Sequence, residues 1–161
     1  FFIKDLSYLD KFLLSLVFFL GLLSDLQKLK SPSLRLIFQF LIIFIILFNN
    51  KIYVNETRLI YLDLLLDKHF IFKLFFTLFC LLILINGTNF IDGVNGLSAG
   101  YYIIVIINIL FHSINNNFPI EHYNLTILLQ FLVIFLLFNI FSKIFLGDSG
   151  SYLISLYMGL I

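Results

Sequence analysis

The chain carries three aspartates that each stand next to a serine or a glycine: Asp25, Asp92 and Asp148. Carboxylates beside flexible backbone suit a hard divalent cation, and Mg²⁺ prefers one or two protein carboxylates together with phosphate oxygens. A phosphate-bearing substrate is therefore the natural partner of such a set. A lone aspartate near a helix end is more often a cap, but three such residues on one membrane face would favour a functional role.

Two glycine-containing segments surround the second and third of these aspartates. The segment NFIDGVNGL places Asn89, Asp92 and Asn95 three residues apart, and a glycine follows each of the last two. This spacing stacks polar side chains on one side of a helical turn, and the glycines let a ligand approach the backbone closely. The segment LGDSGS at 146–151 opens an apolar stretch, so its N–H groups are suited to an anion at a helix start.

Basic residues follow the first aspartate in the segment SDLQKLKSPSLR. These residues are Lys28, Lys30 and Arg35. For Lys30 and Arg35 the sequence leaves two interpretations open. They attract a lipid phosphate, or they mark the level of the lipid headgroups.

Composition defines the surroundings in which these residues must work. The 161 residues are 61% hydrophobic and 12% charged, whereas soluble domains average about 45–50% and about 25%. Helices this apolar must be buried in lipid, which excludes a water-soluble domain. The net charge of +1 gives no basic surface for nucleic acid. Cys80 is the only cysteine, so the chain holds neither a disulfide framework nor a thiolate metal site.

The hydrophobic blocks predict an all-α, polytopic transmembrane helix bundle with about five complete spans and the start of a sixth. The blocks cover approximately residues 6–24, 34–50, 69–87, 97–115, 124–142 and 151 onward. Residues 49–68 predict a short hairpin or an interfacial element outside the bilayer. Because successive spans reverse direction, the connections after the first, third and fifth blocks emerge on the same face. The three aspartates therefore belong to one side of the membrane.

In order and spacing, the segments GLLSD at 21–25, SPSLRL at 31–36, NGTNFIDGVNGL at 86–97 and FLGDSGS at 145–151 resemble the polyprenyl-phosphate glycosyl-1-phosphate transferases, glycosyltransferase family 4. This family includes phospho-N-acetylmuramoyl-pentapeptide transferase and undecaprenyl-phosphate N-acetylglucosaminyl-1-phosphate transferase. The resemblance implies transfer of a sugar-1-phosphate from a UDP-sugar to polyprenyl phosphate, with Mg²⁺ as cofactor and UMP as product. It implies a bacterial plasma-membrane enzyme whose site faces the cytoplasm.

The resemblance also implies roles for individual residues. Asp148 would be the Mg²⁺ ligand, and Asp25 would be the second residue of the family's aspartate pair. Asp92 would be a third catalytic residue, in the nucleotide-sugar pocket. The substrate-binding residues carried over from the family are Lys28, Asn89, Asn95 and Phe145, with Asn95 near the uracil and Phe145 stacking on it.

Two positions depart from the family pattern. Ser24 replaces the first aspartate of the pair, and Asn95 stands where many members have an acid. A serine cannot act as the base, so Asp25 takes that role or no base is needed, since a phosphate monoester is largely dianionic at pH 7. The departures favour an N-acetylhexosamine-1-phosphate transferase that initiates surface polysaccharide of the O-antigen or lipopolysaccharide type. The alternatives are the peptidoglycan enzyme that forms lipid I and an inactive relative that binds lipid or a partner.

The extent and orientation of the chain lead to further expectations. Residues 1–161 are expected to be one transmembrane catalytic domain truncated at both ends, from a protein of about ten to eleven spans by the resemblance. The positive-inside rule does not orient it, because the predicted motif face has four Lys and Arg and the opposite face six.

A transporter would place its acids near the midplane rather than at helix ends. A homodimer is one option for the assembly.

Overall fold

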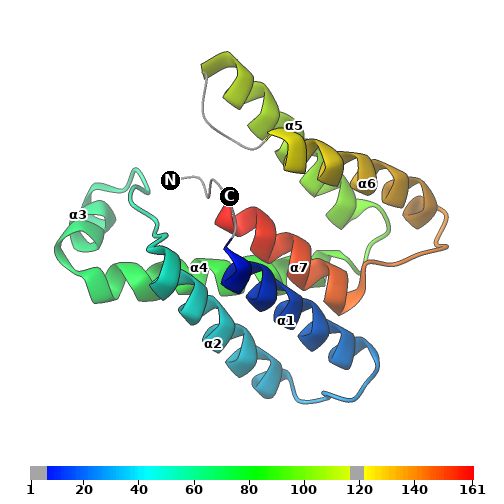
Figure 1. The fold of residues 1–161 in the computed structure, drawn as a ribbon, viewed down its shortest axis with the longest axis horizontal. Coiled ribbons are helices and arrows are strands. Elements are labelled where there is room, and N and C mark those ends of the chain that lie inside the picture. The colour runs from blue at the N-terminus through cyan, green and yellow to red at the C-terminus, as the bar shows by residue number, and fades with distance from the viewer. Residues whose placement is uncertain (1–6, 117–121) are drawn as a thin grey trace.

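The computed structural model describes residues 7–116 and 122–161, which form helices joined by short connections and contain no strand (Figure 1). The helices are α1 (Tyr8–Asp25), α2 (Pro32–Asn50), α3 (Ile60–Lys68), α4 (Phe70–Ile91), α5 (Leu97–Asn116), α6 (His122–Ile140) and α7 (Gly147–Leu160). Each predicted hydrophobic block lies within or overlaps one of these helices. The prediction of an all-α membrane bundle is therefore confirmed.

Three of the helices are long and apolar enough to cross a membrane in the described part of the chain: Pro32–Asn50, Phe70–Ile91 and Tyr123–Ile140. Leu97–Ser113 is a shorter apolar helix. The helix α1 contains three charged residues, and α7 is only 14 residues long. Of the two helices that flank the predicted site, α1 therefore carries charges within its span, and α7 is the shortest of the predicted spans.

The start of α1 accommodates a buried charge. Ser7 and Asp10 form a reciprocal capping box, in which the Ser7 hydroxyl accepts from the Asp10 N–H at 3.2 Å and the Asp10 carboxylate accepts from the Ser7 N–H at 3.1 Å. Asp10 also accepts from Asn50 Nδ2 at 2.7 Å. This contact joins the start of α1 to the end of α2. The carboxylate is fully buried, and these donors satisfy it.

The connection between α2 and α4 does not form the hairpin that its sequence allows. Residues 51–59 have no regular pairing, and a short helix, α3, follows them. The N–H and hydroxyl of Thr57 donate to Asp63 Oδ1 at 2.7 and 2.6 Å, and these bonds lower the pKa of Asp63. Ile60 and Tyr61 are 76% and 87% exposed. Exposed apolar side chains on a short helix agree with the other prediction for this segment, an interfacial element outside the bilayer.

The short helix α7 lies between α1 and α4, and it packs more extensively against α1 than against any other helix (Figure 1). The approach is closest at Gly21, where an added Cβ would lie 2.4 Å from Ser149 Cα. Only glycine permits this crossing. The main core follows from it and is built from α1, α2, α4 and α7, with Val17, Ile43 and Leu156 fully buried.

The helices α5 and α6 form an antiparallel pair that has a smaller core of its own (Figure 1). Tyr102, Ile106 and Leu125 are buried in this core, which reaches Met158 on α7. The face of α6 away from α5 keeps large apolar side chains such as Phe131 exposed. Such a face is stable in lipid, where apolar side chains need no protein cover.

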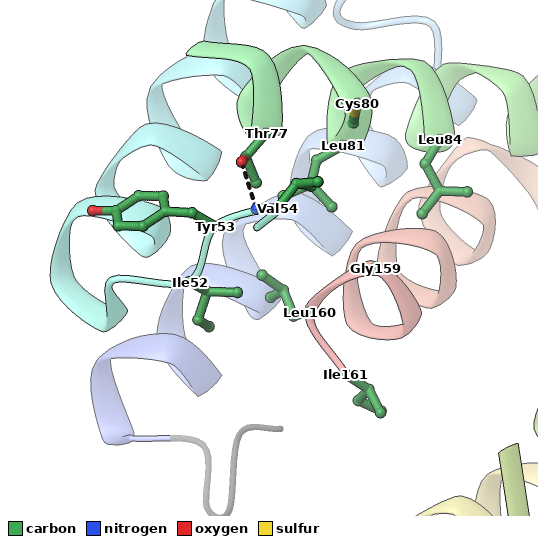
Figure 2. Close-up of a pocket in the computed structure, with 10 residues that line it drawn as sticks. All are labelled: Ile52, Tyr53, Val54, Thr77, Cys80, Leu81, Leu84, Gly159, Leu160 and Ile161. Atoms are coloured by element: carbon green, nitrogen blue, oxygen red, sulfur yellow. Dashed lines mark hydrogen bonds between the residues drawn. The ribbon is translucent and has the colours of Figure 1, made fainter. Parts of the chain in front are cut away.

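A cavity of about 400 Å³ lies at the end of the bundle where α2 leaves for α3 (Figure 2). The Val54 N–H donates to the Thr77 hydroxyl at 2.9 Å and ties this connection to α4. The lining is apolar apart from Thr77 and Tyr53, and it includes Cys80. No charged residue lines it.

The crossing of α1 and α7 should be sensitive to a single methyl group. Gly21→Ala should lower the free energy of unfolding by about 1–3 kcal/mol, because the methyl group must displace backbone rather than a mobile side chain. Thermal unfolding in detergent measures this change. Gly87→Ala on α4 is the matched control, since its added Cβ meets nothing within 4 Å. Equal stability of the two variants would contradict the close crossing.

Candidate active site

The three connections that alternation predicts on one face do meet, and they meet at the first turn of α7. Asp25, at the end of α1, accepts from the N–H groups of Asp148 and Ser149 at 2.8 and 3.0 Å. Asp92, which follows α4, accepts from the Gly147 N–H at 3.1 Å. Leu146, the residue before the helix, provides no side-chain cap. Two carboxylates from other helices therefore satisfy the amides that α7 leaves free at its start.

Gly147 is required at this junction for two reasons. Its φ of +67° lies in the left-handed region that glycine adopts readily. An added Cβ would also lie 2.9 Å from Asp25 Oδ2. The glycine thus lets the chain turn into α7 while the Asp25 carboxylate remains against the backbone.

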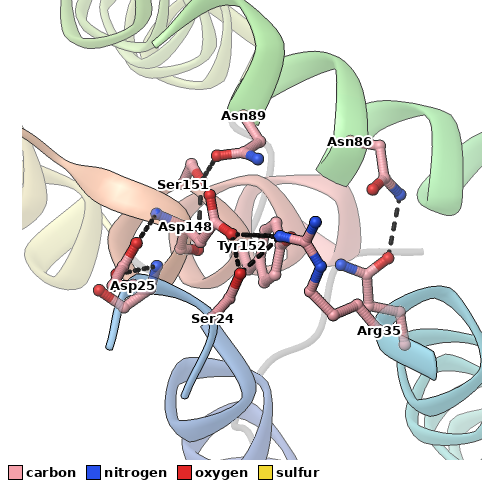
Figure 3. A network of polar contacts seen from close by, with 10 residues as sticks. Ser24, Asp25, Arg35, Asn86, Asn89, Asp148, Ser151 and Tyr152 are labelled. Atoms are coloured by element: carbon pink, nitrogen blue, oxygen red, sulfur yellow. Dashed lines mark hydrogen bonds and ion pairs between the residues drawn. The ribbon is translucent and has the colours of Figure 1, made fainter. Parts of the chain in front are cut away.

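Asp148 projects from the same turn into a polar cluster (Figure 3). Arg35 Nη1 lies 2.6 Å from Asp148 Oδ2 and donates at 2.5 Å to the Ser24 hydroxyl. The Ser24 hydroxyl in turn donates to Asp148 Oδ2, and the Tyr152 hydroxyl lies 3.4 Å from the same oxygen. Side chains from α1, α2 and α7 therefore converge on one carboxylate oxygen.

The pair of Arg35 and Asp148 is partly shielded from solvent, with 23% and 19% of the two side chains exposed. A charged pair at this depth is stable only when its remaining donors and acceptors are also satisfied. Ser24 and Tyr152 contribute to that on the carboxylate side. Arg35 Nε is buried and has no partner among the described residues. The guanidinium therefore retains donor capacity beyond its bond to Asp148.

A second polar layer connects α4 to the helices on either side of it (Figure 3). Ser151, one turn after Asp148, donates to Asn89 Oδ1 at 3.0 Å. Asn86 Nδ2 donates at 3.0 Å to Gln39 on α2. Gln39 is fully buried, four residues after Arg35. The asparagines of α4 thus fix the spacing of α2, α4 and α7 beside the charged pair.

Asn95 is engaged with the neighbouring connection. Its Nδ2 donates to the Ser142 hydroxyl at 2.6 Å, and the adjacent Gly96 N–H donates to Asn139 Oδ1 at 2.5 Å. Asn139 also donates to the Ile144 carbonyl at 2.8 Å and is 3% exposed. The connections before α5 and before α7 are therefore joined through one buried amide.

Lys28 and Phe145 are near the site in sequence, three residues after Asp25 and three before Asp148, and they are not members of the polar cluster. Lys28 is exposed in the turn after α1. Phe145 is 62% exposed, immediately before the LG of the α7 start. Both side chains are exposed, so a ligand on the side of the membrane where the three aspartates lie could contact them.

Some contributors were not assigned from the sequence. The sequence allows two interpretations of Arg35, and its motifs assign no role to Tyr152, Ser151 or Asn139. Tyr152 had a usable signal, because residues four apart share a face of a helix and it follows Asp148 by four. Asn139 had none, since its partners become neighbours only when the helices pack.

Burial raises the pKa of the Asp92 carboxyl above its usual value. The hydrogen bond from the Gly147 N–H acts in the opposite direction, and the charges of Asp25 and Asp148 raise the pKa further. Three carboxylates lie close together here with one arginine among them. The site therefore favours an added cation or an added proton.

The fold and the site define a polytopic membrane protein with an acidic, arginine-paired site where its helices end on one face. The family model for glycosyl transferase family 4 matches residues 11–161, and the chain belongs to this family. Phospho-N-acetylmuramoyl-pentapeptide-transferase of Petrotoga mobilis (strain DSM 10674 / SJ95) is 33% identical to it over 170 residues. The match covers 94% of this chain and 52% of that relative, so the chain spans about half the length of the relative. No solved structure matches the chain.

Removal of the cap on α7 should destabilise the protein. Asp25→Ala leaves two N–H groups without acceptors, so the free energy of unfolding should fall by about 0.5–2 kcal/mol. Asp25→Asn retains one acceptor oxygen, so its free energy of unfolding should fall less than that of Asp25→Ala. Asp67→Ala, at an exposed position on α3, is the control and should change stability by less than about 0.5 kcal/mol. Thermal unfolding in detergent that ranks Asp25→Ala with the control would contradict the capping role.

The raised pKa of Asp92 predicts a specific pH dependence. The folded state holds the proton more tightly than the unfolded chain, whose carboxyl titrates near about pH 4. The stabilisation is complete below that value and is lost as pH rises through the raised pKa. Asp92→Asn keeps an acceptor for the Gly147 N–H and cannot ionise, so that contribution to the decline should vanish. Thermal unfolding against pH, without divalent cations, tests this, and an unchanged profile would contradict it.

Proposed function

We propose that the protein containing this chain transfers a sugar-1-phosphate from a UDP-sugar to polyprenyl phosphate and releases UMP. The observation that carries the proposal is the position of Asp148, which the first turn of α7 holds beside Arg35 and Ser24 at one end of the membrane helices. Membership of glycosyl transferase family 4 supports the reaction class. Both substrates carry phosphate, which matches a site that combines carboxylates with a guanidinium.

The donor set fits Mg²⁺ held jointly by the protein and the substrate. Among the described residues, no group of three His, Cys, Asp or Glu side chains is arranged to hold a metal ion. Mg²⁺ needs only one or two carboxylates when phosphate oxygens and water complete its shell. Asp148 and Asp92 each place one oxygen in the hydrogen bonds described above, both Oδ2, so Oδ1 remains for a cation. Bound there, Mg²⁺ would neutralise charge on the diphosphate and on the departing UMP.

The proposed reaction needs no strong base. An oxygen of the lipid phosphate attacks the β-phosphorus of the UDP-sugar, a new P–O bond forms, and the bond from that phosphorus to the bridging oxygen breaks. The electron pair leaves with UMP. The attacking monoester is largely dianionic at pH 7. Ser24, a poor base, is therefore compatible with turnover, and its hydroxyl orients Arg35 and Asp148 instead.

Arg35 is the residue most suited to hold a phosphate. A guanidinium presents a planar fork of donors that matches two phosphate oxygens. One of its N–H groups is engaged with Asp148 and Ser24, and Nε has no partner in the described part of the chain. Asp25 then acts as a positioning residue, because its carboxylate holds the turn that carries Asp148. Asp92 holds the same turn through Oδ2 and offers Oδ1 to the cation.

Two donor classes are candidates. Ser24 and Asn95 in place of family acids favour a UDP-N-acetylhexosamine and the initiation of a surface polysaccharide. The similarity to a phospho-N-acetylmuramoyl-pentapeptide-transferase favours a UDP-muramoyl-pentapeptide as the second candidate. In both cases we place the site at the cytoplasmic face of a bacterial plasma membrane, where a nucleotide sugar is available. Lys28, Asn89, Asn95 and Phe145 are the side chains that we assign to the nucleotide sugar.

Asp148→Asn tests the proposed function in the full-length protein. UMP release is followed in membranes with polyprenyl phosphate, Mg²⁺ and each UDP-sugar in turn. The substitution should lower turnover by at least about a hundredfold, because it removes the charge that faces the reacting phosphates. Asp67→Asn on α3 is the matched control and should keep the parent rate.

The outcomes separate the alternatives. Release by the parent and by Asp67→Asn alone supports the transferase, and the accepted UDP-sugar identifies the branch. UMP release by Asp148→Asn at the parent rate would contradict the catalytic role proposed for Asp148. Release by none of them, with either donor, contradicts the proposed function and favours an inactive relative.

A further inference from the structure

A groove between α1 and α2 continues from the polar cluster along the apolar part of the bundle. Its apolar section has a volume of about 380 Å³. The residues that line this section are Leu16, Phe19, Leu20, Leu23, Leu29, Phe38 and Ile42. The members from α1 follow a spacing of three and four, so they form one stripe of that helix. Phe38 and Ile42, four residues apart, form the facing stripe on α2.

The end of the groove toward the site is polar and has a volume of about 390 Å³. It is lined by Ser24, Gln27, Leu29, Lys30 and Arg35. This polar end and the apolar section share Leu29. Leu23 and Ser24 are consecutive, and Arg35 lies one turn before Phe38. The two sections therefore adjoin at Leu29, so the groove has a polar end and an apolar end.

The polar end reaches the reaction centre. Ser24 and Arg35 line it, and both contact Asp148. The apolar section runs from Leu23 back to Leu16, about 10 Å along α1 at the helical rise of about 1.5 Å per residue. A ligand with an anionic head at Arg35 and a hydrocarbon chain along α1 would thus present its head to Asp148.

We propose that this α1–α2 groove binds the acceptor lipid, a linear-chain phosphate monoester, with the phosphate at Lys30 and Arg35 and the chain along Leu16 to Leu23. The inference rests on the proposed function and adds the place and orientation of the acceptor. Lys30 and Arg35 line the polar end, no acid is among its lining residues, and Arg35 is also paired with Asp148 beside it. A monoester carries about −1.5 to −2 charges at pH 7 and matches them, whereas the phosphodiester of an ordinary membrane lipid carries one.

The other large apolar cavity does not meet these requirements. It lies where α2 leaves for α3, and its lining contains no charged residue (Figure 2). Lys30 and Arg35, which belong to the α1–α2 groove, are absent from it. The combination of an apolar channel with a cationic end thus distinguishes the groove beside the site.

The binding site is mapped with a photoactivatable prenyl monophosphate added to the full-length protein in membranes. Crosslinks should fall on the peptides that contain Leu16 to Leu23 or Phe38 to Ile42. Excess polyprenyl monophosphate should compete for them. Neither phosphatidylglycerol nor an uncharged prenol should compete comparably, because neither has a dianionic head.

Two substitutions test the apolar and polar ends separately. Leu16→Trp should raise KM for the lipid by about tenfold or more, because the indole occupies the space of the chain. Leu9→Trp is its control, with a leucine on the same helix of similar exposure, 42% against 37%, outside the groove. Lys30→Gln should raise KM for the lipid by about fivefold. Lys143→Gln, an exposed cation outside the groove, is its control. KM for the UDP-sugar should stay unchanged in all four.

The outcomes distinguish failure of this inference from failure of the proposed function. Crosslinks in the groove without UMP release by the parent contradict the transferase and leave the lipid site in place. Turnover with crosslinks elsewhere, or groove variants that match their controls, overturns the groove and leaves the transferase. Equal competition by phosphatidylglycerol also overturns it, because the groove then holds bulk lipid.

Discussion

The arrangement of the site depends on how the first turn of α7 obtains acceptors for its amides. The helix begins after Leu146, which supplies none, and at a glycine with positive φ. Asp25 and Asp92 accept from its first three N–H groups. These bonds join the ends of α1 and α4 to the start of α7, so one unsatisfied helix end assembles three distant segments. The negative charges of these two carboxylates are also stabilised by the positive end of the α7 helix dipole.

Placement of Asp148 follows from that junction. Its amide is held by Asp25, and its side chain reaches toward α2, where Arg35 meets it. The arginine stabilises the Asp148 carboxylate, which lies close to the negative charges of Asp25 and Asp92. The Nε of the same arginine is buried and has no partner among the described residues. Arg35 therefore balances charge in the structure, and under the proposed function the same side chain would bind the substrate phosphate.

Hydropathy and alternation predicted the helices and the common face of the three aspartates, because both depend on local patterns and on the bilayer. The connection after the third block was placed too early, since α4 continues through Asn86 and Asn89 to Ile91. The hairpin option for residues 49–68 was wrong, because residues 51–59 form no strand and the helix α3 follows them. The caps on α7 could not be read from sequence, since Asp25 and Ser149 are far apart in the chain. The roles taken from the family remain predictions.

Ser24 illustrates how a departure from the family pattern is compatible with the site. Its hydroxyl accepts from Arg35 and donates to Asp148, so it links a cation and an anion without adding charge. An aspartate at this position would place a further carboxylate against Asp148 and compete for Arg35. The serine thus leaves the α1–α2 groove with two cations and no acid at its polar end. If a dianionic phosphate binds there, the neutral residue favours binding, and the loss of a potential base has little consequence for a nucleophile that is already ionised.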